Sequence, residues 1–474
     1  MERELYDSYI EILKEELLPA MGCTEPIAVA LAAATARDTL GALPDKITLS
    51  VSGNIVKNVK SVVVPHTGGL KGLAASVAAG IIAGNAEKKL EVIADVTPEQ
   101  IPLIAKYLEK TPCTVTESNS GCIFDIEIRV FSDGHSAATR IAGHHTNIVR
   151  IEKDGVALLS VDYQDTQKET AAASENSTSD NHLGNISNSI LSASSCGDNT
   201  ALTDTETNPP SSNCRQFANK ADRSLLSIEN IVRFADEVDL SLIHDTIARQ
   251  IAYNTAIAEE GLKNAYGAQI GRILLASYGD GVQNRAKAMA AAGSDARMNG
   301  CELPVVINSG SGNQGMTTSL PVIVYAKELG ASDELLYRAL VVANLVTIHL
   351  KTGIGRLSAY CGATSAGCGA GAGITYLYGG RFREISHTIV NAIAINSGVI
   401  CDGAKASCAA KIASSVEAGL LGMHMFLHGS QFKDGDGIVT KGVENTIRNV
   451  GKLAREGMKE TDREIIHLML QKMS

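Results

Sequence analysis

The chain has 474 residues, of which 45% are hydrophobic and 20% are charged, so we expect a globular protein with roughly two to three domains. Its 42 Lys and Arg residues and 52 Asp and Glu residues give a net charge of −10, which argues against a nucleic-acid partner. The best apolar run, residues 72–84, is too short to cross a membrane, and the amino terminus has no secretory signal pattern. We therefore expect a cytoplasmic protein without a membrane partner.

The first 164 residues mix helical and strand patterns, which predicts an α+β domain over residues 1–164. Apolar residues at helical spacing predict a helix over 6–20, and Pro26 suits the first turn of a second helix that ends near Leu40. Alternating apolar and polar residues predict strand and hairpin structure over 46–65. The remaining predictions are helices over 70–83 and 98–110, a strand over 90–96, and mostly strands over 114–150.

Residues 165–223 break these patterns. This segment of 59 residues contains 10 Ser, 7 Thr and 8 Asn, with no apolar periodicity. Such a composition buries too little apolar surface to offset the entropy lost on ordering, so we predict a disordered, low-complexity insertion. Cys196 and Cys214 lie within it and are left out of the candidate site.

Residues 224–474 predict a mostly helical domain joined by glycine-rich turns. The fold class is therefore α+β: a mixed amino-terminal domain followed by a helical carboxy-terminal domain, which carries most of the candidate site. The predicted helices cover residues 228–238, 240–265, 267–277, 335–350, 369–378, 385–394, 404–421 and 442–473.

Five of the ten cysteines lie in the helical domain, and four of them, Cys361, Cys368, Cys401 and Cys408, stand among Gly, Ala and Ser residues. Without a secretory signal they should be reduced, which indicates buried thiols, metal ligands or catalysis. A turn at Asp402-Gly403 would make Cys401 a loop residue and start a helix near Ala404, so that the sulfurs of Cys401 and Cys408 converge. Small buried cysteines of a helical core are the alternative. The paired spacing of a structural zinc site is absent.

A glycine-rich segment, residues 308–315, follows an apolar run, residues 303–307. Its backbone N–H groups, with its Asn and Gln amides, could bind a carboxylate or a phosphate. It matches neither a Walker A loop nor a dinucleotide-binding fingerprint. A joint at which helices pack closely is the alternative. The candidate binding residues are Ser309, Ser311, Asn313, Gln314 and Gly315.

Cys23 and His66 are candidate acid–base groups. Cys23 precedes a helix that begins near Pro26, where a thiol's pKa is lowered, although a small structural cysteine fits equally well. His66 lies just before a glycine turn and is either an acid–base group or a hydrogen-bonded structural residue. We expect His144 and His145 at the surface and His349 in a core helix.

Four motifs together resemble the L-cysteine desulfidase family, which is similar in turn to the alpha chain of iron–sulfur L-serine dehydratases. They lie at residues 21–30, at 309–316, at 361–363 with a Gly pair at 379–380, and at 400–408. The resemblance covers nearly the whole chain outside residues 165–223. That segment departs from the family's pattern, and Cys368 matches no ligand of the family.

The resemblance implies a 4Fe-4S cluster held by Cys361, Cys401 and Cys408, whose intervals are 40 and 7 residues. The implied reaction is β-elimination of L-cysteine to sulfide, pyruvate and ammonia without pyridoxal phosphate. The residues 309–315 would bind the substrate carboxylate, and Ser52, Gly53 and Asn54 would line a cleft between the domains.

For the catalytic base, the resemblance leaves Cys23 or His66, and Cys23 could instead cap the fourth iron. The alternatives are an L-serine dehydratase of the same fold and a non-catalytic iron–sulfur sensor. The expected partner is a small amino-acid substrate. The sequence does not determine the oligomeric state, and a homodimer is compatible with it.

Overall fold

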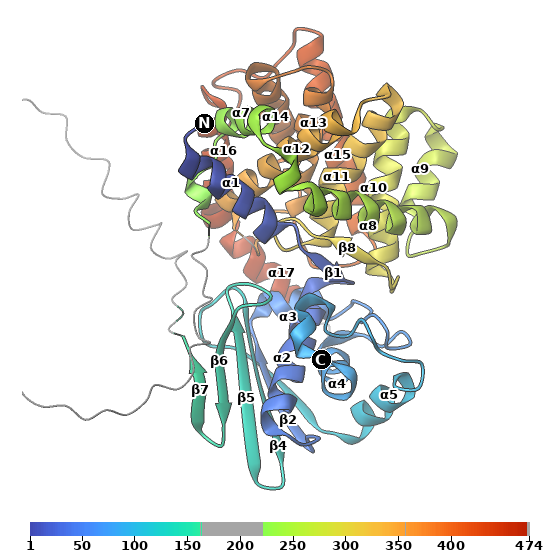
Figure 1. Cartoon of the computed structure of the whole chain (residues 1–474), viewed down its shortest axis with the longest axis vertical. Coiled ribbons are helices and arrows are strands. Elements are labelled where there is room, and N and C mark those ends of the chain that lie inside the picture. The colour runs from blue at the N-terminus through green and yellow to red at the C-terminus, as the bar shows by residue number, and fades with distance from the viewer. Residues whose placement is uncertain (162, 164–220, 356, 472–474) are drawn as a thin grey trace, which may run out of the picture. The chain divides into compact units, whose positions relative to one another are not determined.

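A six-stranded mixed sheet organises the amino-terminal half of the chain (Figure 1). The computed structural model describes residues 1–161, 163, 221–355 and 357–471. The strand order is β3-β2-β4-β5-β6-β7; β2 and β3 are parallel, and the other neighbouring strands are antiparallel. The strands are β2 (Lys46–Val51), β3 (Cys113–Glu117), β4 (Asp125–Ser132), β5 (His135–Ala142), β6 (Ile148–Lys153) and β7 (Val156–Ser160).

One face of this sheet is covered by helix α2 (Thr24–Leu40), which packs against β4, β5, β6 and helix α4 (Gly72–Ala83). The alternating side chains of Ile47, Leu49 and Val51 are buried, which confirms the strand expected there. Helices α2 and α4 pack closely at Gly80, because glycine has no Cβ atom. A Cβ atom added there would lie 2.2 Å from the carbonyl oxygen of Ala30. Only glycine permits this approach.

Two elements of the amino-terminal half differ from the prediction. Residues Gly53–Val59 form helix α3 rather than a hairpin, because the Ser52 carbonyl accepts hydrogen bonds from the N–H groups of Ile55 and Val56. The expected strand over 90–96 begins instead as a 3-10 turn, Ala86–Glu91. Its apolar residues are buried in the core without joining the sheet. The helix expected over 98–110 is confirmed as α5 (Ile101–Lys110).

The carboxy-terminal half is helical, which confirms the expected fold class. Its short elements are the strand β8 (Pro304–Val306), 3-10 turns at Arg223–Leu225 and Leu240–Leu242, and a π turn at Leu453–Gly457. Sequence patterns missed α10 and α11 because both helices are buried on most sides and so lack an amphipathic stripe. The helices are α7 (Ile228–Glu237), α8 (His244–Lys263), α9 (Ile270–Tyr278), α10 (Val282–Met298), α11 (Gly312–Leu329), α12 (Asp333–Ile354), α13 (Gly362–Leu377), α14 (Phe382–Asn396), α15 (Cys408–Leu427), α16 (Val443–Lys452) and α17 (Lys459–Gln471).

Among the described helices, α12 has the length and hydropathy of a membrane-crossing helix. Within its most apolar window, 67% of the residues are buried inside the protein. The central helix of a packed core has the same composition, and α12 contacts α7, α11, α13 and α16.

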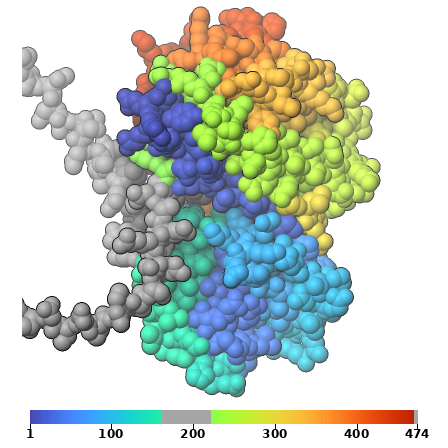
Figure 2. Space-filling model, viewed as in Figure 1, coloured from blue at the N-terminus to red at the C-terminus, as the bar shows by residue number. Residues whose placement is uncertain are grey.

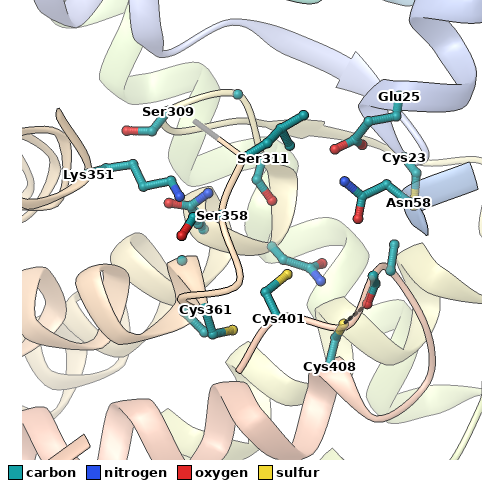
Figure 3. Close-up of a pocket in the computed structure, with 18 of the residues that line it drawn as sticks. Cys23, Glu25, Asn58, Ser309, Ser311, Lys351, Ser358, Cys361, Cys401 and Cys408 are labelled. Carbon is teal, nitrogen blue, oxygen red and sulfur yellow. Dashed lines mark hydrogen bonds between the residues drawn. The ribbon is translucent and has the colours of Figure 1, made fainter. Parts of the chain in front are cut away.

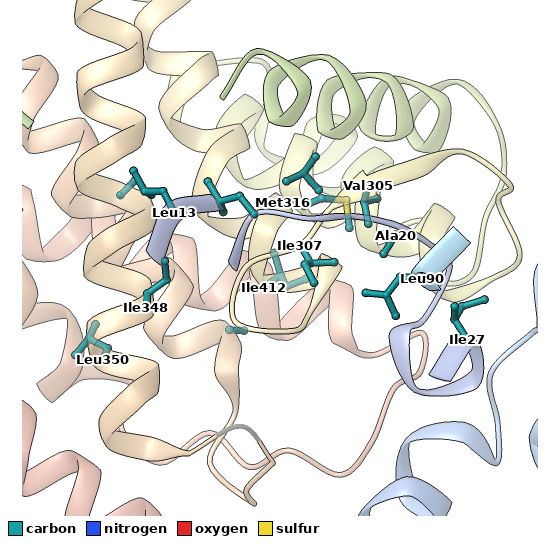
Figure 4. Packing of buried hydrophobic residues seen from close by; sticks show 14 of the residues in the cluster. Leu13, Ala20, Ile27, Leu90, Val305, Ile307, Met316, Ile348, Leu350 and Ile412 are labelled. Carbon is teal, nitrogen blue, oxygen red and sulfur yellow. The ribbon is translucent and has the colours of Figure 1, made fainter. Parts of the chain in front are cut away.

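The two ends of the chain cross between the halves. Helix α1 (Arg3–Glu16) lies on the helical half (Figure 2). There the rings of Tyr6 and Tyr9 contact the ring of Phe234. Strand β1 (Pro19–Met21) then pairs with β8, and α17 packs against α3. Figure 4 shows the core beside this crossing: Leu13 of α1 lies in one cluster with Met316 of α11 and Ile348 of α12.

The described fold resumes at Ala221, three residues before the expected start of the helical domain at residue 224. The guanidinium of Arg223 pairs with Glu15 and Glu16 of α1, so residues 221–223 belong to the packed fold. Residues 164–220, with Cys196 and Cys214, lie outside the described part of the chain.

Helices α13 and α15 run parallel and nearly touch. Gly367 of α13 lies against Ser415 of α15, and Gly371 lies against Gly419, so four residues along one helix match four along the other. The same offset between the two helices applies at their amino-terminal ends. Cys361, which precedes α13, therefore lies level with Cys408, the first residue of α15. The contact thus sets the amino termini of both helices side by side.

We predict that Gly367→Ala lowers the free energy of unfolding by about 1–3 kcal/mol, the usual cost of overpacking. The added Cβ would lie 2.1 Å from the Ser415 carbonyl oxygen, so the helices must separate. Denaturant or thermal unfolding measures the loss. Gly398→Ala is the matched control, because its Cβ meets nothing within 4 Å. Equal stability of both variants would contradict the close packing.

Candidate functional site

A cavity of about 110 Å³ lies where four of the described helices begin (Figure 3). Cys23 is the residue before α2, Ser311 precedes α11, Cys361 precedes α13, and Cys408 opens α15. A helix amino terminus carries unpaired N–H groups and a partial positive charge. The convergence of four such ends favours anions in this cavity.

A short backbone bridge places Cys361 beside Cys401. Tyr360 and Ile400 form an antiparallel bridge, in which the N–H of Cys361 donates to the Val399 carbonyl at 3.0 Å. Cys408 completes the group from the start of α15, and its thiol donates to the Gly403 carbonyl at 3.7 Å. All three cysteines, which the family resemblance implied as a set, line the cavity.

The three thiols differ in acidity. The Cys361 thiol donates to Cys401 and lowers the pKa of Cys401 to about 5, with help from the positive charges of Lys57 and Lys351. The same pairing, together with burial, raises the pKa of Cys361. Burial also raises the pKa of Cys408. Cys401 is thus the most acidic of the three thiols, and the thiolate is the form in which cysteine binds iron.

The loop between Cys401 and Cys408 is longer than expected. Cys401 is a loop residue as predicted, but α15 begins at Cys408 and not near Ala404. The Asp402 carboxylate pairs with Lys405 and Lys411, and the Lys405 ammonium also donates to the Asp402 and Gly403 carbonyls. These bonds close a compact loop in place of the expected first helical turn.

The glycine-rich turn lies beside these cysteines. Ser309 and Gly310 have positive φ angles of 49° and 82°, and the backbones of Asn308 and Ser311 exchange hydrogen bonds. Ser309, Ser311, Asn313 and Gln314 line the cavity. Gly315, predicted as a binding residue, is not among the residues that line it, because it packs against the backbone of β8, where a Cβ would lie 2.0 Å from the Val306 carbonyl oxygen.

A buried amide network supports this turn from behind. The side chains of Gln250 and Asn344 exchange two hydrogen bonds, and the Asn308 amide donates to Asn344 at 2.9 Å. The Ser309 hydroxyl then donates to the Asn308 side chain at 2.9 Å. The three amide residues are fully buried, so the network holds Ser309 in its left-handed conformation.

Cys23 lines the cavity, but its thiol is not acidic. Burial raises the pKa of Cys23 to about 12, against the lowering predicted from its place before a helix. The side chain is 1% exposed, and its thiol donates to the Met298 sulfur at 3.7 Å. Desolvation therefore outweighs both the helix terminus and the nearby charge of Arg297.

Four other predicted residues do not line the cavity. Nδ1 of His66 lies 3.4 Å from Oε1 of Glu302. Ser52 and Gly53 begin α3, and the Asn54 amide donates to Asp462 of α17 at 3.0 Å. The next turn of α3 instead contributes Lys57 and Asn58. Because 53–59 was expected to be a hairpin, helical spacing was not applied there.

Sequence reasoning also missed several polar residues that line the cavity. His145 was expected at the surface but is 7% exposed, with its ring edge against Phe124. Glu25 lies within the motif that contains Cys23, yet its carboxylate was not considered. No sequence signal identified Arg297 or Lys351, because each is a single charge within a buried helix. The missed residues are Glu25, Lys57, Asn58, His145, Arg297, Lys351 and Lys411.

Three buried polar atoms at the cavity have no hydrogen-bond partner among the described residues. They are Nε2 of His145, Oε1 of Gln314 and the hydroxyl of Tyr360. Buried polar groups in folded proteins are nearly always paired, so several unpaired groups in one cavity indicate a ligand site.

Comparison with known proteins identifies relatives along the whole chain. The family model described as serine dehydratase alpha chain matches residues 87–467. A UPF0597 protein of Desulfitobacterium hafniense is 53% identical over 476 residues, covering 100% of this chain and 99% of that protein. A UPF0597 protein of Lachnoclostridium phytofermentans is 47% identical over 466 residues, covering 98% of this chain and 100% of that protein.

We predict that Asn344→Leu destabilises the protein by about 2–5 kcal/mol, because the Gln250 and Asn308 amides lose buried partners. Amide hydrogen exchange over residues 309–312 should also become faster. Unfolding and exchange measurements test both effects. Asn264→Leu, at an exposed amide, should change stability by less than about 0.5 kcal/mol. Parent-like exchange in Asn344→Leu would show that the network does not hold the turn.

Proposed function

Because the chain belongs to the serine dehydratase alpha chain family, we propose that it is a cytoplasmic L-cysteine desulfidase that needs no pyridoxal phosphate. Membership indicates a lyase-type enzyme, and the family is generally associated with iron–sulfur clusters. The proposed reaction is β-elimination of L-cysteine to sulfide and aminoacrylate, which water converts to pyruvate and ammonia. The observation that carries the proposal is the convergence of Cys361, Cys401 and Cys408 on a cavity with unpaired polar groups.

The donor set suits an iron–sulfur cluster, because three cysteine thiols line one cavity and the irons of such clusters take thiolate ligands. In a four-iron cluster each of the three thiolates would bind a different iron. Cys361, Cys401 and Cys408 would hold the cluster, and the cationic side chains of Lys57 and Lys351 would favour its negative charge.

When bound, a cluster with three protein ligands would supply one open iron, a Lewis acid for the leaving thiolate of the substrate. The chain's own residues bind and orient the amino acid. The hydroxyls of Ser309 and Ser311, with the amino terminus of α11, suit the substrate carboxylate.

Cys23 remains the cavity residue proposed to act on the Cα proton or to gate the open iron. A thiol with a raised pKa is a weak base at neutral pH, which favours the gating role. His66 is less suited to act as the base, because it does not line the cavity.

L-serine dehydratase is the second candidate, favoured by the name of the matching family. It would use the same site with hydroxide instead of sulfide as the leaving group. Anaerobic reconstitution, followed by assays for sulfide, pyruvate and ammonia with each amino acid, separates the two activities.

We predict that replacing Cys361, Cys401 or Cys408 by Ser abolishes both the visible absorption of the cluster and turnover, because each thiolate holds one iron. Absorption spectra and iron content after anaerobic reconstitution measure the effect. Cys368→Ser is the matched control, since Cys368 lies buried in α13 and does not line the cavity. A full cluster in all three variants would refute the ligand assignment.

We predict that Cys23→Ala retains the cluster, with iron and sulfide content near that of the parent, while turnover falls by roughly 100-fold or more. Exchange of the substrate's Cα hydrogen with solvent distinguishes the two roles. Exchange stops if Cys23 is the base and continues if Cys23 gates the open iron. His66→Ala is the paired control and should keep its turnover. Parent-like turnover in Cys23→Ala would exclude both roles.

A further inference from the structure

The cavity has an uneven distribution of charge. Among the described residues that line it, Lys57, Arg297, Lys351 and Lys411 are cationic, whereas Glu25 carries the one carboxylate. Lys57 and Lys411 pair with acidic residues outside the cavity lining, Asp462 and Asp402. No salt bridge joins Glu25 to any of these four cations, and the ring of His145 lies 3.9 Å from its carboxylate.

Glu25 is fixed where it stands. It lies in the first turn of α2, and its Oε2 accepts a hydrogen bond from the Thr24 hydroxyl at 3.1 Å. The same O–H hydrogen is shared with the Gly310 carbonyl at 2.9 Å, the shorter of the two contacts, so Thr24 links Glu25 to the glycine-rich turn. In Figure 3 Glu25 lies beside Cys23 and Asn58, across the drawn pocket from the cluster cysteines.

The other carboxylate oxygen faces an unpaired nitrogen. Oε1 of Glu25 lies 3.9 Å from Nε2 of His145, which is too far for a direct hydrogen bond. That nitrogen is buried and has no hydrogen-bond partner among the described residues. A single group with two or more N–H donors, placed between the two atoms, would satisfy both when the His145 hydrogen is on Nδ1.

We propose that Glu25, assisted by His145, binds the α-ammonium group of the substrate and thereby selects α-amino acids over α-hydroxy acids. An ammonium group supplies the required donors and the opposite charge. The substrate carboxylate then binds on the side of Ser309 and Ser311, so the two ends of the zwitterion meet opposite charges. This inference rests on the proposed function, because it names the substrate class for that same site.

The test measures binding of L-alanine and L-lactate to the anaerobically reconstituted full chain by calorimetry. These probes differ only in the α-ammonium or α-hydroxyl group, and neither has a leaving group at Cβ. The parent should bind L-alanine at least about 10-fold more tightly than L-lactate. In Glu25→Gln, affinity for L-alanine should fall about 10- to 100-fold, whereas affinity for L-lactate should stay within about 2-fold. His145→Gln should give a smaller loss in the same direction.

Glu302→Gln is the matched control, because Glu302 is exposed and lies outside the cavity lining. It should keep the parent's preference. Equal affinity of the parent for both probes would overturn the inference, and this measurement does not depend on a variant that folds. An equal loss for both probes in Glu25→Gln would also overturn it. Failure of the proposed function is separate: the parent would release no sulfide or pyruvate, while its preference for L-alanine could still be measured.

Discussion

The site depends on the contact between α13 and α15. Two parallel helices can approach this closely only where glycine and other small residues remove the side chains between them. The contact sets both helix starts level, and the bridge between Tyr360 and Ile400 brings in the loop that carries Cys401. The positions of all three proposed ligands thus follow from backbone packing.

Helix termini and burial act in opposite directions on the thiols of this site. Cys23 and Cys361 both precede a helix, where partial positive charge favours a thiolate. Burial nevertheless raises the pKa of Cys23, and the hydrogen bond to Cys401 together with burial raises the pKa of Cys361. Cys401 lies in a loop and is the acidic thiol, because Cys361 donates to it and two lysines lie near. A hydrogen-bond donor therefore decides the acidity here more than the helix terminus does. For this reason the sequence correctly placed Cys23 before a helix but wrongly predicted a lowered pKa for its thiol.

The sequence predicted the fold class and the strand β2, because these depend on local patterns such as alternation along a strand. The set of Cys361, Cys401 and Cys408 was implied by the family resemblance, since their spacing alone left their role open. Lys57 and Asn58 were missed because the hairpin expected after β2 is a helix. His145 and Arg297 were missed for another reason. These two side chains are buried by contacts with segments that are distant in the sequence, and a local sequence pattern does not show such contacts.

The mixed half and the helical half of the chain both contribute residues to the site. The mixed half contributes Cys23, Glu25 and His145, and the helical half contributes the cluster cysteines. The chain ends reinforce this joint, since α1 packs on the helical half and Asp462 of α17 pairs with Lys57 at 2.6 Å. The helical half alone would therefore hold the proposed ligands but lack the proposed ammonium site. Both halves must therefore assemble to place the proposed ammonium site, Glu25 and His145, in the same cavity as Cys361, Cys401 and Cys408.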